Sequence, residues 1–123
     1  MEIQKKLNAF KKEKNCTLLC IGPMSKNCVD ASIELAEEHK TPLILIASRR
    51  QIDSEQFGGG YVENWTTNHF AEYVIKKDIN KNIILARDHG GPWQNDYEKN
   101  QNMNLREAMK SAKDSYKADI DAG

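Results

Sequence analysis

The chain has 123 residues, a formal net charge of zero and 29% charged residues. This length suits one domain, and the even charge balance argues against a broad surface for nucleic acid or an anionic membrane. No apolar run reaches the roughly 20 residues that a membrane span requires. Residues 1–6 lack the apolar stretch of a secretory signal, so we expect a cytoplasmic protein.

The first third of the chain predicts a helix, a strand and a second helix. Residues 2–12 place apolar side chains at helical spacing among charged ones, which indicates a short amphipathic helix. Residues 16–23 form a brief apolar run closed by glycine and proline, as in a buried strand. From Ser25 onward small and apolar side chains share one helical face, and this helix should end before Pro42.

The remaining two thirds predict two more strands, each followed by a loop and a helix. Residues 43–47 are apolar without alternation, which is typical of a strand covered on both faces in a parallel sheet. A polar loop then leads to a helix that Thr66 or Thr67 can cap. Residues 82–87 form the third strand, and a long polar loop follows it.

The last predicted helix begins after Asn104, which can serve as its N-cap. Its inward stripe should consist of the apolar and aromatic side chains Leu105, Ala108, Met109, Ala112 and Tyr116. The element order is therefore a helix followed by three strand–helix units. Such repeats with right-handed crossovers predict an α/β fold with a parallel sheet, either open or closing into a barrel.

The Asp88–His89 pair is the most suggestive candidate site, because reactive groups of parallel α/β folds gather at the carboxyl ends of strands. Adjacent strand-end side chains point apart unless the backbone bends, and the following Gly-Gly-Pro permits a bend. A neutral imidazole is a good zinc ligand, and a nearby carboxylate can move a proton. Alternatively, Asp88 accepts hydrogen bonds from loop amides and His89 is an ordinary surface group.

The loop after the second strand is a second candidate. Arg49 and Arg50 can hold a phosphate, and the amides of a glycine triplet that includes Gly59 and Gly60 can cradle one. By composition alone, the alternative of a flexible solvated loop fits this stretch as well. The three cysteines, Cys16, Cys20 and Cys28, show no metal spacing and favour free thiols.

Three stretches resemble the accessory, non-catalytic subunit family of class II tagatose-bisphosphate aldolase. Residues 47–53 and 56–61 are similar to its alanine-threonine-serine-asparagine-glutamine and glutamine-phenylalanine-glycine-glycine-tyrosine signature. Residues 66–70 resemble its threonine-proline-alanine-aspartate-phenylalanine helix start. Residues 83–92 resemble the strand end that carries its aspartate-histidine pair. The resemblance covers nearly all of the chain from about residue 16, in the same order.

The resemblance implies a partial (β/α)8 TIM barrel, in which residues 1–123 supply an N-terminal helix and about the first three βα units. In the related zinc-dependent aldolases, the corresponding histidine binds zinc and the aspartate transfers a proton. Carried over, His89 would be the metal ligand and Asp88 the catalytic acid/base. Gln51 would lie near the sugar phosphate.

Arg50, Gly59, Gly60 and Arg87 complete the predicted substrate-binding set. The chain departs from the family at Arg49 and Arg50, which replace serine and asparagine, and at Arg87, which replaces a glycine. We expect Arg87 either to pair with Asp88 or to contact a substrate phosphate.

The chain also looks incomplete beside a full barrel of about 250 residues, and a zinc site needs ligands from later strands. We therefore expect an accessory protein of sugar-phosphate metabolism that supports a catalytic class II aldolase subunit. One alternative is a zinc-dependent ketose-bisphosphate aldolase, a carbon–carbon lyase, completed by a missing C-terminal half of the barrel. Another is a phosphate-binding α/β domain without chemistry. In each reading the small-molecule partner is a sugar bisphosphate or its phosphate group.

Overall fold

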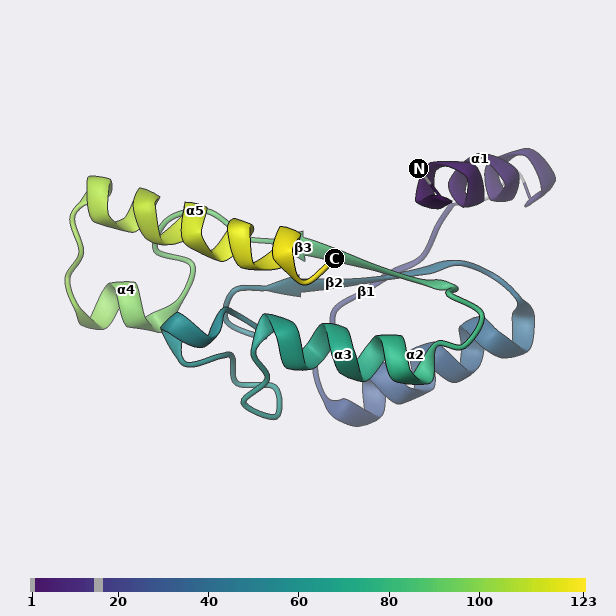
Figure 1. The fold of residues 1–123 in the computed structure, drawn as a ribbon, viewed down its shortest axis with the longest axis horizontal. Coiled ribbons are helices and arrows are strands. Elements are labelled where there is room, and N and C mark those ends of the chain that lie inside the picture. Colours follow the sequence, from purple (N-terminus) through teal and green to yellow (C-terminus); the bar gives the residue numbers. More distant parts are fainter. Residues whose placement is uncertain (1, 15–16) are drawn as a thin grey trace.

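A computed structural model describes residues 2–14 and 17–123 (Figure 1). The elements follow the expected order, with one additional short helix. They are α1 (Glu2–Lys14), β1 (Cys20–Ile21), α2 (Lys26–His39), β2 (Leu43–Ser48), the 3-10 turn η1 (Glu55–Phe57), α3 (Thr67–Lys77), β3 (Ile83–Asp88), α4 (Asp96–Asn100) and α5 (Leu105–Asp121).

The described strands form one parallel sheet in the order β1-β2-β3, which confirms the predicted parallel α/β arrangement. β2 and β3 pair along their whole length, from Leu43 opposite Ile83 to Ser48 opposite Asp88. β1 contains two residues and is shorter than expected from the apolar run. Cys16, at the start of that run, lies outside the described residues. Closure of the sheet into a barrel stays a prediction.

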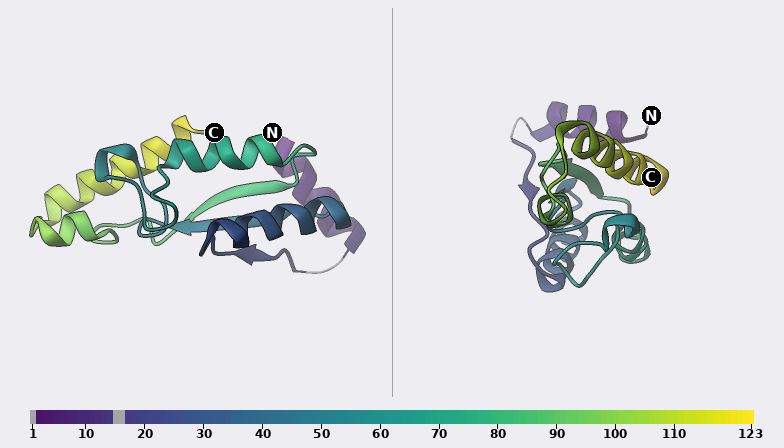
Figure 2. Two further views of the ribbon diagram at one scale, coloured as in Figure 1. Left: turned by 90° about the horizontal axis from the view of Figure 1, so that it is seen from below. Right: turned by 90° about the vertical axis from the view of Figure 1, so that its left-hand side faces the viewer.

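Helices α2, α3 and α5 lie along one side of the sheet (Figures 1 and 2). On β2 the side chains of Leu43, Leu45 and Ala47 face this helical layer and are buried. The core cluster joins this face to the helices through Val29, Ile33, Leu45, Ala47, Ile52, Val62, Phe70 and Val74. Burial of these apolar side chains is the main force that holds α2 and α3 on the sheet.

The other side of the sheet, called here the open face, carries Ile44, Ile46 and Ser48 of β2 and their partners Ile84, Ala86 and Asp88 of β3. Except for Asp88, which is exposed, these residues are only half-buried. The expectation that residues 43–47 are covered on both faces is therefore wrong for the described chain. Alternate residues of a strand point to opposite faces, and the helices cover one of them.

Helix α1 lies beside the amino ends of β2 and β3 (Figure 2). The Nζ of Lys6 donates to the carbonyl oxygen of Asn80, 3.1 Å away, in the turn that precedes β3. Phe10 lines a cavity together with Leu43 at the start of β2. The candidate site lies at the opposite, carboxyl ends of the strands.

Polar caps fix the helix starts as expected. Thr66, and not Thr67, caps α3 by accepting a hydrogen bond from the His69 amide. Asn104 caps α5 in a reciprocal capping box with Glu107. The long polar loop before Asn104 contains α4, which the sequence interpretation missed because five residues are too few to show a helical period.

The predicted inward stripe of α5 is partly wrong. Ala108 and Ala112 are buried, but Leu105, Met109 and Tyr116 are 60%, 42% and 46% exposed. The buried positions are completed instead by two serines, Ser111 and Ser115. The face of α5 that turns inward therefore differs from the predicted one. Its two serine hydroxyls donate to the buried carboxylates of Glu98 and Asp53.

Candidate functional site

The loops that follow β2 and β3 begin at the same edge of the sheet, because Ser48 and Asp88 are paired in register. Strand alternation sends Arg87 to the helical layer and Asp88 to the open face. The predicted acid/base residue thus lies at the carboxyl end of β3, which is the edge where parallel α/β folds place their reactive groups.

Asp88 and His89 lie together in the structure. The Oδ2 of Asp88 is 3.4 Å from the Nε2 of His89, and the two side chains are 54% and 66% exposed. Asp88 also accepts a hydrogen bond of 2.8 Å from the His89 amide through Oδ1. Asp88 therefore accepts from a loop amide, as one of the two interpretations expected, and its predicted role in moving a proton stays a prediction.

The bend that joins this pair occurs at His89 itself. Its φ of 45° lies in the left-handed region, whereas the sequence interpretation assigned the bend to the following glycines. A left-handed residue directly after an extended one turns the chain sharply. The two neighbouring side chains therefore meet instead of pointing to opposite faces.

Arg87 pairs with Asp119 of α5 and not with Asp88. Its Nε donates to Asp119 Oδ2 at 2.8 Å and its Nη2 to Asp119 Oδ1 at 2.5 Å. Its Nη1 donates to the carbonyl oxygens of Ala47 and Ile52. The alternation of β3 explains this choice, since Arg87 faces the helices and Asp88 does not. Its predicted contact with a substrate phosphate stays a prediction.

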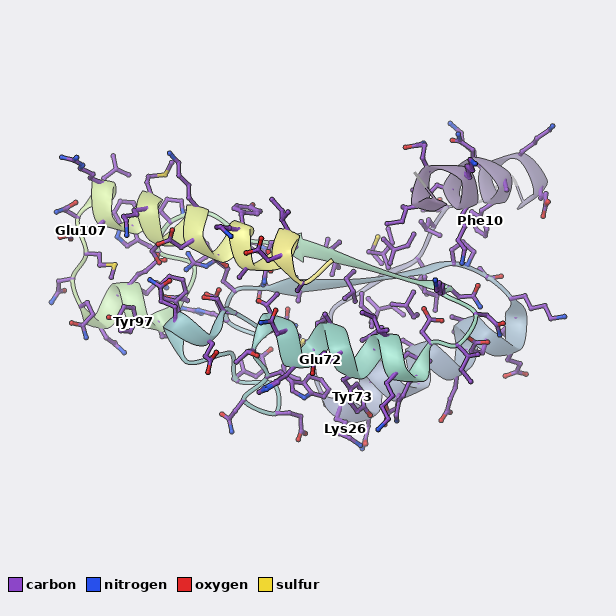
Figure 3. All side chains as sticks on the ribbon, viewed as in Figure 1. Phe10, Lys26, Glu72, Tyr73, Tyr97 and Glu107 are labelled. Carbon is purple, nitrogen blue, oxygen red and sulfur yellow. The ribbon has the colours of Figure 1, made fainter. Side chains whose placement is uncertain are left out.

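Arg50, Gly59 and Gly60 line one small cavity of about 140 Å³, shared with Arg49, Phe57, Tyr61, Asn95, Asp96 and Tyr97. The Arg50 side chain is half-exposed, and its Nη2 is 3.1 Å from Oδ1 of Asp96. Figure 3 shows Tyr97 on α4, next to the turn η1 whose Phe57 packs on it at 5.9 Å between ring centroids. The cavity therefore brings together three of the predicted substrate-binding residues.

In this conformation the glycine triplet makes backbone contacts within its own loop. The amides of Gly58, Gly59 and Gly60 donate to carbonyl oxygens of the same loop, at 2.9, 3.2 and 3.1 Å. A Cβ at Gly60 would lie 2.0 Å from the Gln51 carbonyl oxygen. The glycines thus allow two stretches of backbone to touch, and in this conformation their amides are already used. A phosphate cradle made by them would require the loop to open.

Gln51 is buried in the turn that follows β2. Its side-chain oxygen accepts the Ser48 amide at 2.8 Å, and its side-chain nitrogen is 3.1 Å from the Met24 sulfur. The residue therefore ties the loop after β1 to the loop after β2. It is absent from the lining of the Arg50 cavity, so its predicted place near a sugar phosphate is untested.

The feature that the sequence interpretation missed is a network of buried polar side chains, called here the Arg49 network. It consists of Arg49, Asp53, Asn95, Glu98, Ser111 and Ser115, of which Arg49, Asp53 and Glu98 have no exposed surface. Arg49 Nε is 3.0 Å from Asp53 Oδ2, and its Nη1 is 2.5 Å from Glu98 Oε1. The i,i+4 spacing of Arg49 and Asp53 was the available sequence signal, but nothing pointed to Glu98.

The hydrogen bonds of this network satisfy both carboxylates. Asp53 also accepts from Asn95, Ser115 and the Ser54 amide, at 2.8, 2.6 and 2.8 Å. Glu98 accepts from Ser111 Oγ and from the Trp93 amide. A buried charge is tolerated only with such partners. The serines that replaced the expected apolar stripe of α5 supply two of them.

Metal ligands do not gather in the described part of the chain. Residues 2–14 and 17–123 contain no group of three His, Cys, Asp or Glu side chains placed to hold one ion. His89 with Asp88 beside it offers fewer than the three or four protein ligands of a zinc site, so the described residues alone do not fit a complete one. Cys20 and Cys28 are free thiols, as expected.

No known family model matches the sequence, and no curated protein matches it. Among solved structures, the chain is similar to a probable tagatose 6-phosphate kinase from Sinorhizobium meliloti, with a TM-score of 0.60 and 23% identity. The match covers 85% of this chain and 26% of that one, so the chain spans about a quarter of that protein's length. At this identity the likeness shows a shared α/β fold.

None of the helices within residues 2–14 and 17–123 combines the length and the apolar character needed to cross a bilayer.

Proposed function

We propose that this chain forms part of a sugar-phosphate-binding (β/α)8 barrel and acts as an accessory subunit for a class II tagatose-bisphosphate aldolase. The observation that carries the proposal is the Asp88–His89 pair at the carboxyl end of β3, where Asp88 shares the open face of the sheet with Ser48. If the sheet closes into a barrel with its helices outside, this face becomes the interior. The pair then lies at the mouth where barrels bind substrate.

Three further features support the substrate class. The structural neighbour is named for a tagatose phosphate, and the resemblance in residues 47–61 and 83–92 points to the same group of sugars. The Arg50 cavity also offers a half-exposed guanidinium, the side chain best suited to bidentate phosphate contacts. In this role Arg50 exchanges its exposed partner Asp96 for the phosphate.

His89 is the one described residue to which we assign a zinc-binding role. With ligands from elsewhere in the assembled barrel, His89 would hold the ion, and the chemistry the ion would supply there is Lewis-acid polarisation of a ketose carbonyl. Asp88 is the neighbouring group that can accept or return a proton. In an accessory subunit the carbon–carbon cleavage belongs to the partner aldolase, and this pair contributes to binding.

Binding is tested by calorimetry of the chain with D-tagatose 1,6-bisphosphate and, separately, with inorganic phosphate. We expect Arg50→Gln to weaken binding of the bisphosphate by about tenfold, the usual scale of one lost charged hydrogen bond. Arg106→Gln is the matched control, because Arg106 is an exposed arginine on α5 outside the Arg50 cavity. Equal affinities of the two variants would exclude Arg50 as the phosphate ligand.

The accessory role is tested by mixing the chain with a catalytic class II aldolase and measuring ketose-bisphosphate cleavage. We expect the chain to raise or stabilise the partner's activity, and Asp88→Asn to weaken this effect only as far as it weakens substrate binding. A complex that loses its activity with Asp88→Asn, but retains it with Asp121→Asn on the surface of α5, would indicate that Asp88 is catalytic.

The Arg50 cavity favours a second candidate, a phosphate-binding α/β domain without chemistry, because the cavity is lined within the described chain and needs no metal. The same calorimetry separates the two functions. Sugar-bisphosphate binding that survives both a chelator and His89→Gln, with the exposed His69→Gln as control, supports the second candidate. Binding that is lost with the metal supports the barrel proposal.

A further inference from the structure

The turn formed by residues 88–93 is held in an unfavourable backbone conformation. His89 and Trp93 have φ values of 45° and 56°, in the left-handed region that side-chain-bearing residues rarely adopt. Such conformations persist where the surrounding structure over-determines them, and they cluster at functional sites. The contacts that hold this turn therefore decide whether Asp88 and His89 meet.

Arg49 and Glu98 hold the far end of the turn. Arg49 Nη1 donates to the Gly91 carbonyl oxygen at 3.1 Å, and the Glu98 carboxylate accepts the Trp93 amide. These two side chains are themselves paired and fully buried, so the turn is fixed to the interior and not to a mobile surface group.

The near end is held by packing. A Cβ at Gly90 would lie 2.3 Å from the Tyr116 hydroxyl, which shows how closely α5 covers this position. The Asp88 carboxylate accepts the His89 amide at 2.8 Å. Between these contacts, the carbonyl group of Gly91 is the point at which Arg49 acts on the turn.

We propose that Arg49 is a positioning residue, which fixes through Gly91 and Glu98 the bend that brings the Asp88 and His89 side chains together. The task assigned to that pair rests on the proposed function, but the bend is a property of the chain itself. Without the bend, strand alternation directs the two side chains to opposite faces.

An arginine is required because the contacts diverge. The planar guanidinium donates from Nε to Asp53, from Nη1 to Glu98 and Gly91, and from Nη2 to Ser111. A lysine presents its donors from one nitrogen and cannot reach these four groups together. Arg49→Lys therefore preserves the charge and removes the positioning contacts.

The experiment is NMR spectroscopy of the ¹⁵N-labelled chain. The three-bond coupling between the amide and α protons of His89 reports φ, and amide exchange of Trp93 reports its bond to Glu98. In Arg49→Lys we expect the His89 coupling to change and Trp93 exchange to accelerate about tenfold, the scale of one lost hydrogen bond. The backbone chemical shifts of the paired residues in β2 and β3 should stay as in the wild type, which would show that the sheet itself is unchanged.

Ser115→Ala is the matched control, because Ser115 is as buried and belongs to the same network, but its hydroxyl donates to Asp53 and not to the turn. It should lower stability and leave the turn unchanged. A folded Arg49→Lys with wild-type coupling and exchange in the turn would overturn the inference, as would equal disturbance of the turn by Ser115→Ala. Should Arg49→Lys not fold, Glu98→Gln carries the test through the His89 coupling alone, because Glu98 binds the Trp93 amide directly.

These readouts do not depend on any ligand. A chain that binds no sugar bisphosphate, yet shows the turn-specific response, contradicts the proposed function and supports the positioning role.

Discussion

Two parts of the interior lie on the helical side of the sheet. The apolar core cluster packs α2 and α3 on β2, whereas the Arg49 network lies between the loops after β2 and β3 and α5. Leu45 and Arg49, four residues apart, are both fully buried, one surrounded by hydrocarbon and the other by hydrogen-bonding groups. The two regions should respond differently to substitution. The apolar core tolerates replacements that preserve side-chain volume, whereas the Arg49 network depends on matched charges.

The largest effect should come from removing the central charge of the Arg49 network. Arg49→Met leaves the buried carboxylates of Asp53 and Glu98 without their cation, which costs about 3–5 kcal/mol of unfolding free energy. Urea unfolding followed by circular dichroism measures this loss. Arg50→Met, at the half-exposed neighbouring arginine, should cost less than about 1 kcal/mol. Similar losses in the two variants would show that burial does not distinguish the two arginines.

The apolar core should respond to volume. Leu45→Ala should cost about 2–5 kcal/mol by the same measurement, because the packed interior cannot fill the cavity. Leu45→Met, which nearly preserves volume, should cost less than about 1.5 kcal/mol. No equally mild replacement is expected at Arg49. If Leu45→Met were as damaging as Leu45→Ala, side-chain shape and not volume would govern this core.

The smallest effect concerns a group of polar contacts between α2 and α3, called here the polar clip. In it, Tyr73 and Lys77 of α3 bind Asp30 of α2. Figure 3 shows Tyr73 beside Lys26, whose Nζ lies 5.6 Å from the ring centroid. Burial alone raises the pKa of Asp30, but the hydrogen bonds from Lys77 and Tyr73 outweigh it and hold the pKa below its usual value.

Because the folded pKa of Asp30 is lowered, its contribution to stability is complete above the unfolded pKa of about 4 and is lost as pH falls through the folded value. Unfolding midpoints in urea between pH 7 and pH 2 should therefore decline less steeply below about pH 4 in Asp30→Asn than in the wild type. Asp121→Asn, in an exposed pair on α5, serves as the control. Parallel curves for Asp30→Asn and the wild type would contradict the clip's role.

The same division separates what the sequence predicted from what it did not. The strands at residues 43–47 and 82–87, the helices and the caps at Thr66 and Asn104 follow from apolar period and local hydrogen bonding, and these predictions are confirmed. These signals are local, so one sequence contains them. The position of Asp88 and His89 at a strand end follows from the same local signals.

The polar interior was not predictable because its partners are distant in sequence. Arg49 binds a serine 62 residues away and a glutamate from a short helix with no visible period. Charged residues are mostly exposed, so Arg49 was assigned to a phosphate site or a solvated loop. The predicted buried stripe of α5 contained only apolar and aromatic residues, so it included the exposed Leu105, Met109 and Tyr116 and did not include Ser111 and Ser115.

The crossing of backbone at Gly60 has a genetic consequence. A single methyl group there would collide with the Gln51 carbonyl carbon and oxygen, at 2.2 and 2.0 Å, and neither atom can swing away as a side chain does. In a saturation library, position 60 should therefore lose every replacement, alanine included. Position 91, where a Cβ meets nothing within 4 Å, should accept many of them. After selection, position 60 would thus contain glycine alone, whereas position 91 would contain many residue types.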